Sequence, residues 1–253
     1  MNYPPLIEGR LLRRYKRFLA DVETAEGGCL TVHCPNTGSM KNCAAPGSRV
    51  WYWDSGNSQR KYPHTWELVE TTLDEGGGGS IAGLAGVNTA RPNHLAREAI
   101  ESGCLVELQG YSEILREVAY GKERSRIDLL LRASDRADCY VEVKSVTLAV
   151  GSGVGLFPDS VSARGAKHLR ELMAVVKAGY RGVLLYVVPH TAIERVAPAH
   201  EIDPEYAATL RQALACGVEV IAYGANISLD AITLERRLMF SDDVRVFDKR
   251  ESI

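Results

Sequence analysis

The stretches Arg126–Arg132 (RIDLLLR) and Tyr140–Ser145 (YVEVKS) decide the interpretation of this chain. Both have the apolar, β-prone character of strands, and each carries charged residues inside it. Because successive side chains of a strand point to opposite faces, Glu142 and Lys144 share one face, and a turn between the strands places Asp128 roughly opposite Glu142. Charge on an otherwise apolar sheet face is costly unless it binds something. The pattern therefore predicts two carboxylates and an ammonium that converge around a divalent metal ion.

The composition is that of an ordinary globular protein, and 253 residues allow one large domain or two modest ones. The sequence contains no apolar run of membrane-spanning length and no secretory signal at the N-terminus, so we expect a cytoplasmic protein without membrane association. The formal net charge of -2 argues against a generally polycationic surface. Any nucleic-acid binding must therefore come from local clusters of positive charge. The cysteines form no close CxxC pair, and we expect reduced thiols.

The chain changes character near residue 86. Before it, short strand-like segments alternate with Gly-, Pro- and Asn-containing turns, which is typical of a small barrel. After it, helices and strands alternate, which predicts an α/β domain on a mixed sheet. The glycine-rich stretch Asp74–Ser80 is either a flexible connector or a surface loop of the first domain.

Helix signals place the elements of the second half. Asn93 is the expected N-cap of a helix over 94–102. Asp203, followed by Pro204, predicts the start of a helix that ends at Gly217. Strands are expected over 111–118, 126–132, 139–146, 183–188 and 218–223, and a further helix over 160–178.

Magnesium prefers oxygen ligands and is usually held by one or two carboxylates, several waters and substrate phosphate. Asp128 and Glu142 would supply those carboxylates. The ion can lower the pKa of an attacking water and neutralise charge on a phosphodiester, and Lys144 would orient that water or stabilise the developing charge. The simpler alternative is a Glu-x-Lys on the solvated face of a half-exposed sheet, which is common. The lone acid in the apolar preceding strand favours the functional interpretation.

The order of a helix, a three-strand meander, an acid and a Glu-x-Lys resembles the PD-(D/E)xK nuclease superfamily, and the whole chain resembles the sugar fermentation stimulation protein A family. The segments that carry the resemblance are Arg17–Val22, His33–Met40, Arg60–Tyr62, Ser125–Asp128, Tyr140–Val146, Phe157–Val161 and Arg164–Leu169. The resemblance implies an α+β protein: an N-terminal OB-like β-barrel (residues 1–86) followed by an α/β PD-(D/E)xK nuclease-like domain with a mixed sheet (residues 87–253). It also implies DNA binding.

The resemblance assigns roles to individual residues. Asp128, Glu142 and Lys144 match the superfamily's acid, second acid and lysine. Glu98 would correspond to an acid that some members aim at the metal, although a Glu at this kind of position more often lies on a solvated helix surface. Ile127 stands where the superfamily's name-giving proline would be, and the metal chemistry does not need that proline.

A basic and aromatic segment, Arg10–Phe18, concentrates five cations beside two aromatic rings. On a strand, Arg13, Tyr15 and Arg17 would share a face that suits stacking on bases and tracking of a phosphate backbone. The alternative is an edge strand kept soluble by its charge. Further cations that could contact phosphates are Arg60, Lys61, Arg164 and Lys167. The last two could equally belong to a solvated helix face.

The leading hypothesis is a DNA-binding protein, largely indifferent to sequence and acting on single- or double-stranded DNA, with Mg²⁺- or Mn²⁺-dependent phosphodiester hydrolysis. The rival is a non-catalytic DNA-binding regulator linked to sugar metabolism. A sugar-binding module has little support, because no aromatic platform is paired with a carboxylate dyad. The cysteines and histidines also fit no structural zinc spacing.

Overall fold

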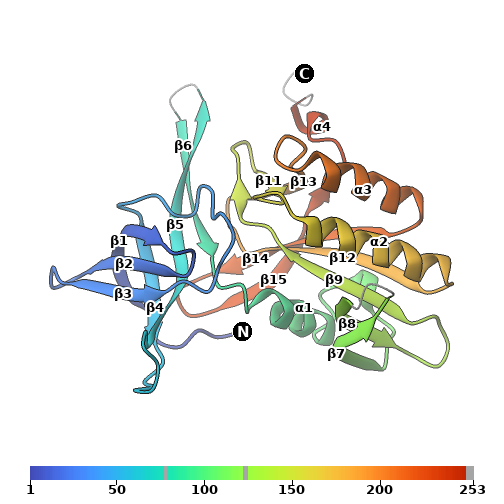
Figure 1. Ribbon diagram of the computed structural model, residues 1–253, viewed down its shortest axis with the longest axis horizontal. Coiled ribbons are helices and arrows are strands. Elements are labelled where there is room, and N and C mark those ends of the chain that lie inside the picture. Colours follow the sequence, from blue (N-terminus) through green and yellow to red (C-terminus); the bar gives the residue numbers. More distant parts are fainter. Residues whose placement is uncertain (77–78, 122–124, 249–253) are drawn as a thin grey trace.

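A closed β-barrel forms the N-terminal part of the computed structural model, which describes residues 1–76, 79–121 and 125–248 (Figure 1). The sheet order is β3-β2-β1-β4-β5-β6, and a parallel bridge between His33 and Thr65 joins β3 to β5 and closes the barrel. Its strands are β1 (Ile7–Tyr15), β2 (Leu19–Thr24), β3 (Cys29–His33), β4 (Arg49–Asp54), β5 (His64–Gly76) and β6 (Gly79–Gly86). Alternating apolar residues such as Leu11, Val22 and Trp66 fill its core. The expected small barrel is confirmed.

The glycine-rich stretch lies within a β-hairpin. The strands β5 and β6 pair from Leu68 opposite Gly86 up to Asp74 opposite Ser80. Residues 77–78 lie outside the described residues. The stretch is therefore not a connector between domains, because the strands on both sides of it belong to the same sheet.

A mixed sheet in the order β15-β14-β12-β9-β8-β7 forms the second part of the structure (Figure 1). β12 runs parallel to both of its neighbours, β9 and β14, and the other pairings are antiparallel. These strands are β7 (Glu113–Tyr120), β8 (Ser125–Arg132), β9 (Cys139–Ser145), β12 (Arg181–Val188), β14 (Glu219–Ile227) and β15 (Ile232–Arg237). The expected α/β domain with a mixed sheet is confirmed.

Helices cover both faces of this sheet, which explains the continuous apolar run of β12. α1 (Pro92–Glu101) packs on the face that includes Val183 and Leu185. α2 (Ala163–Lys177) and α3 (Pro204–Ala215) pack on the opposite face, against Leu184 and Tyr186 (Figure 1). The smaller elements are the 3-10 helix η1 (Val106–Leu108), α4 (Arg245–Asp248), and the strands β10 (Leu148–Ala149), β11 (Val154–Phe157), β13 (Arg195–Pro198) and β16 (Met239–Phe240). Across residues 1–76, 79–121 and 125–248, no helix is both long and apolar enough to cross a membrane.

The start of α1 differs from the expectation. The helix begins at Pro92, and Arg91 holds the N-cap position without a side-chain hydrogen bond. Asn93 lies inside the first turn, so its assignment as the N-cap is wrong. Proline suits the first helical position, because it lacks the N–H that would remain unbonded there. α3 begins as predicted, with Asp203 accepting a hydrogen bond from the backbone N–H of Tyr206.

A buried carboxylate fastens the barrel to the segment that leads into α1. Glu67 on β5 is 1% exposed, and its oxygens accept hydrogen bonds from Arg91 Nε at 2.5 Å, Trp53 Nε1 at 2.8 Å and Asn88 Nδ2 at 2.9 Å. Each oxygen of the buried carboxylate is therefore satisfied. This network ties the orientation of α1, and with it Asn93, to the barrel.

A buried histidine makes a second link between the two parts. His190 is 0% exposed, and its Nδ1 accepts the backbone N–H of Ala192. Its Nε2 therefore carries the proton and donates to Thr71 Oγ1, which donates in turn to the carbonyl of Gly83. Burial lowers the pKa of His190 to about 4. The link consequently requires a neutral imidazole.

We expect this link to weaken in acid. The folded-state pKa lies below the ordinary value of about 6.5, so the stability it contributes is present above pH 6.5 and is lost as the pH falls towards 4. Between pH 7.5 and 5 the loss is about 2 kcal/mol. Urea unfolding at several pH values should show this increment in the wild type and not in His190→Gln. Thr71→Val should lower the free energy of unfolding at every pH but keep the pH-dependent loss. If stability fell equally with pH in the wild type and in His190→Gln, His190 would not be the group responsible.

Candidate metal-binding and catalytic site

The strands β8 and β9 separate where the two acids lie. Their ladder runs from Leu131 opposite Cys139 to Leu129 opposite Val141, so the next position sets Asp128 opposite Glu142. There the side chain of Asp128 replaces a ladder bond, because its Oδ2 accepts the backbone N–H of Val143 at 2.7 Å. The two acids thus occupy opposite positions at a split in the sheet, where the charge of Glu142 acts on Asp128.

Asp128 is held from two sides. Besides the Val143 N–H, its Oδ1 accepts a hydrogen bond from Asn93 Nδ2 on α1 at 2.8 Å. Burial and the nearby charge of Glu142 raise the pKa of Asp128, and the Val143 N–H, Lys144 and Asn93 oppose that rise. A carboxylate whose proton affinity is raised by burial and a second negative charge is stabilised by any cation that binds between them.

Glu142 lies deeper, with 1% of its surface exposed. Lys144 Nζ contacts its Oε1 at 2.5 Å, and His168 Nδ1 hydrogen-bonds the same oxygen. Burial acts to raise the pKa of Glu142, but the hydrogen bond from His168 and the charge of Lys144 outweigh it, so the pKa is lowered. Glu142 is therefore an ionised carboxylate in a buried setting.

One carboxylate oxygen of the site is left without a partner in the described part of the chain. Glu142 Oε2 is buried and has no hydrogen-bond partner among the described residues, which leaves an anionic oxygen without compensation. Within those residues, no three His, Cys, Asp or Glu side chains are grouped to cage a cation. Magnesium needs only one or two protein carboxylates when water and phosphate complete its shell, so Asp128 and Glu142 are the residues here that could hold it.

Glu98 does not join this group. Its carboxylate pairs with the N-terminal ammonium of Met1 at 2.9 Å, and the same ammonium donates to the carbonyl of Ile232 on β15. In the sheet order, β15 is the edge strand farthest from β7 and lies four strands from β8, which carries Asp128. The structure therefore corrects the assignment of Glu98 to the metal: the helix turns this side chain toward the opposite part of the sheet.

Two further groups border the acids. The hydroxyl of Tyr120 is buried without a hydrogen-bond partner in the described part of the chain, and its pKa is raised by burial and by the charges of Glu142, Glu171 and Asp128. Glu171 on α2 is 3% exposed. Its carboxylate approaches Gly121 so closely that a Cβ there would collide with it. The acidic environment thus extends beyond the two predicted carboxylates.

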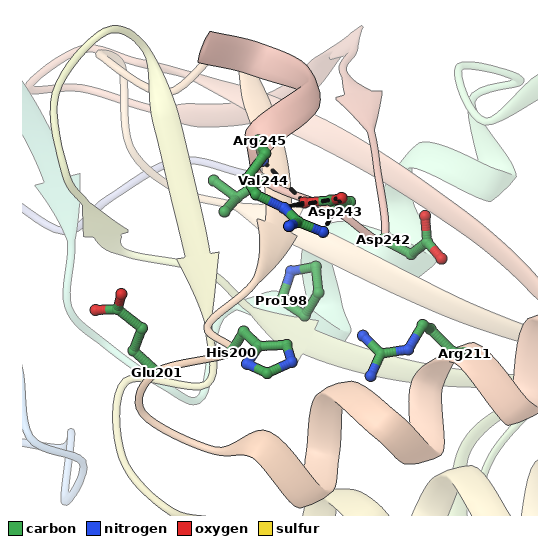
Figure 2. A pocket seen from close by; sticks show the side chains of 8 residues that line it. All are labelled: Pro198, His200, Glu201, Arg211, Asp242, Asp243, Val244 and Arg245. Carbon is green, nitrogen blue, oxygen red and sulfur yellow. Dashed lines mark hydrogen bonds and ion pairs between the residues drawn. The ribbon is translucent and has the colours of Figure 1, made fainter.

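A cavity of about 600 Å³ opens beside Asp128. It is bordered by Asn93 and His94 at the start of α1 and by residues of β7 such as Arg116. A second cavity, of about 620 Å³, lies between α3 and the segment that leads into α4. His200, Arg211 and Asp242 border it (Figure 2). None of the three predicted catalytic residues borders the second cavity, and Asp243 there is already paired with Arg245 at 2.7 Å. Of the three predicted catalytic residues, Asp128 borders the first cavity.

The cations of β1 lie at one end of the barrel. Arg13 Nε contacts Asp21 at 2.8 Å, its guanidinium lies 4.9 Å from the centre of the Tyr15 ring, and its side chain is 70% exposed. Arg17 sits in the turn after β1 with φ of 65°, so it does not share a strand face with Arg13 and Tyr15 as expected. The strand ends at Tyr15, and the chain reverses immediately into β2. Arg17 is nevertheless exposed beside them.

The second predicted cluster adjoins this end. Arg60 contacts Thr65 Oγ1 at 3.4 Å, and Thr65 bridges to His33, which pairs with Leu19 across β2 and β3. Lys61 lies over the ring of Tyr62 at 5.6 Å. Neighbouring strands of one barrel end therefore carry both groups of cations.

A loop of the barrel links this end to the second domain. Arg14 donates to the carbonyls of Asn36 and Gly38 at 2.9 and 2.8 Å. Ser39 in the same loop donates to Asp159 Oδ2 at 2.9 Å. A small cavity between the two parts is bordered by this loop and by Ser145, the residue after Lys144. The loop that Arg14 holds at the cationic barrel end thus borders the same cavity as Ser145, the last residue of the strand that carries Glu142 and Lys144.

The remaining predicted cations belong to α2. Arg164 Nε contacts His168 Nε2 at 3.3 Å, and Lys167 is half-buried. Sequence reasoning assigned no role in the site to Asn93, Tyr120 or Glu171. A polar residue amid the apolar stripe of α2 is the signal that pointed to His168, and it does not specify the partner.

The fold and the site define a class of protein: an OB domain joined to an α/β domain that carries an acid and a Glu-x-Lys at the split of its sheet. Residues 12–78 match the family described as "SfsA N-terminal OB domain", and residues 90–231 match "Sugar fermentation stimulation protein RE domain". The chain belongs to the SfsA family, the sugar fermentation stimulation proteins.

Its relatives resemble it over nearly the whole length. A sugar fermentation stimulation protein homolog of Shewanella loihica is 56% identical over 231 residues, which cover 91% of this chain and 95% of that protein. A homolog of Shewanella baltica is 53% identical over 96% of this chain and 98% of its own length. The structure of Pyrococcus furiosus SfsA in complex with Ca²⁺ matches with a TM-score of 0.81 and 26% identity, over 95% of this chain and 98% of that chain.

Proposed function

We propose that this protein binds single- or double-stranded DNA largely without regard to sequence and hydrolyses phosphodiester bonds with Mg²⁺ or Mn²⁺. The observation that carries the proposal is the placement of Asp128 opposite Glu142 at the split between β8 and β9, with Glu142 Oε2 buried and unpaired among the described residues. A hard cation with oxygen ligands is what such a pair attracts. The Pyrococcus furiosus relative, which was solved with Ca²⁺, supports the same preference.

The residues have distinct roles in this proposal. Asp128 and Glu142 hold the metal ion, which when bound activates water and offsets phosphate charge. The ammonium of Lys144 contacts the carboxylate of Glu142 and can stabilise negative charge that develops beside it. Asn93 and the Val143 N–H keep Asp128 directed into the split. The free thiols of all cysteines suit a reducing cytoplasm, where we place the activity.

The rival function is a DNA-binding regulator that does not cleave. Two observations favour it: the family is named for stimulation of sugar fermentation, and Lys144 is already paired with Glu142 at 2.5 Å. Labelled single- and double-stranded DNA and RNA, incubated with Mg²⁺, Mn²⁺ or chelator, distinguish the two. Metal-dependent cutting of any substrate supports the enzyme. Binding without cutting on every substrate supports the regulator.

DNA binding should depend on the cations at the barrel end. Replacing Arg13, Tyr15 and Arg17 by Ala removes two cations and a stacking ring. For double-stranded DNA, the slope of log Kd against log salt concentration should fall by about 2 with the loss of two phosphate contacts. A salt titration by fluorescence anisotropy measures it.

The control removes two exposed cations far from the barrel, in the double variant Lys177→Ala and Arg211→Ala. It changes the net charge equally and should leave the slope as in the wild type. If both variants lowered the slope alike, the barrel end would not be the binding surface.

A further inference from the structure

The contacts of His168 determine which of its nitrogens carries a proton. Arg164 Nε–H can only donate, and it points at His168 Nε2 at 3.3 Å, so Nε2 must be an unprotonated acceptor. The proton of a neutral ring then lies on Nδ1, which faces the carboxylate oxygen Glu142 Oε1. Lys144 Nζ also lies 3.2 Å from Nδ1, but its closer contact is with that same carboxylate oxygen, at 2.5 Å. The opposite tautomer would set an N–H against the Arg164 N–H and a lone pair against the carboxylate. His168 is 5% exposed, so water cannot readily rescue such a mismatch.

The same contacts make the two oxygens of Glu142 unequal. Oε1 receives His168 Nδ1–H and Lys144 Nζ, which fill both of its acceptor positions. Oε2 receives no hydrogen bond from the described residues and is buried. A carboxylate free to rotate about its last bond would share these donors between its oxygens. Here the position of His168 on α2, above β9, prevents that exchange.

We propose that Arg164 and His168 form a positioning relay for the metal site: Arg164 selects the tautomer of His168, and His168 holds Glu142 Oε1 so that Oε2 remains free for the cation. The inference rests on the proposed function, because the cation is the one that Asp128 and Glu142 would hold. Arg164, expected from the sequence to contact phosphate, here contacts another side chain of the protein, His168. His168 and Arg164 are positioning residues, since neither is placed to touch the metal.

The relay can be tested through metal affinity, without any measurement of cleavage. Asn and Leu have nearly the same shape, but only Asn carries an amide N–H close to the position of His Nδ1. Calorimetric titration with Mn²⁺ should show that His168→Leu weakens Kd by about 10-fold or more, as outer-shell changes at metal sites do. His168→Asn should bind several times more tightly than His168→Leu. A role in filling space alone predicts that the two variants behave alike.

The tautomer provides a second readout on the metal-free protein. ¹⁵N NMR of the His168 ring should show the Nδ1–H form in the wild type and a larger share of the Nε2–H form in Arg164→Met. Lys177→Met, at the exposed end of the same helix, should leave the tautomer unchanged. Because Arg164 is exposed, its substitution should not prevent folding.

The outcomes separate the relay from the function. Mn²⁺ binding by the wild type with equal affinity in His168→Leu, or a wild-type ring in the Nε2–H form, would overturn the relay and leave the metal site standing. A wild-type protein that takes up no Mn²⁺ would overturn the proposed metal site and the relay together.

Discussion

Metal-dependent cleavage should disappear when either acid loses its charge. We expect Asp128→Asn and Glu142→Gln to lower the cleavage rate by about 100-fold to 1000-fold or more, because each removes an anionic metal ligand without changing the size of the side chain. The two sites differ in burial, but both carboxylates serve one cation. Initial rates on the preferred substrate of the wild type, with saturating Mg²⁺, measure the effect.

The control lies in the same hairpin. Asp135→Asn removes the same charge from the exposed connection between β8 and β9, where Asp135 is 66% exposed and paired only with Arg136 among the partners described. Its rate should equal that of the wild type, and DNA affinity should persist in all three variants. Cleavage that survives both Asp128→Asn and Glu142→Gln would show that another site or a contaminating nuclease does the cutting.

Stability should fall most when Glu67 is neutralised. Glu67→Gln removes the anion that pairs with the Arg91 guanidinium. The neutral side-chain amide that replaces it has one acceptor oxygen, which cannot serve all three donors to Glu67. Breaking a buried pair of this kind costs about 3 kcal/mol, at the lower end of the usual range because Arg91 keeps 19% exposure. The free energy of unfolding from urea titration measures it.

The same strand offers the matched comparison. Glu70 on β5 pairs with Arg49 at 3.4 Å, and both side chains are well exposed. Glu70→Gln should therefore cost less than about 1 kcal/mol. If Glu67→Gln cost no more than Glu70→Gln, the junction between barrel and α1 would not depend on the buried carboxylate.

Elements with strong local signals could be predicted from the sequence. Asp203 and Pro204 fix the start of α3 through capping and the fixed φ of proline. The apolar run 183–188 is recognisable as a strand because both of its faces are covered by helices. The short strands β13 and β16 were not predicted from the sequence, because segments of four and two residues carry little local pattern and pair with partners far along the chain. The turn at Arg17 was also not predicted, because its positive φ is imposed by the hairpin.

The candidate site could be predicted from the sequence to a similar extent. Asp128 and Glu142 could be placed opposite each other because alternation and one short turn set their register. Asn93 and His168 reach the acids from α1 and α2, and His168 lies 26 residues from Glu142. Only the packing of helices on the sheet brings them there, and local pattern does not contain that information. Glu98 was misplaced for the same reason.

Diffraction from a crystal soaked in Mn²⁺ tests the central claim most directly, since the anomalous signal locates the ion without reference to activity. The structure predicts a peak at the split between β8 and β9, in contact with a carboxylate oxygen of Asp128 and with Glu142 Oε2. A crystal at saturating Mn²⁺ with no peak there, or with Glu142 Oε2 turned away from the ion, would contradict it.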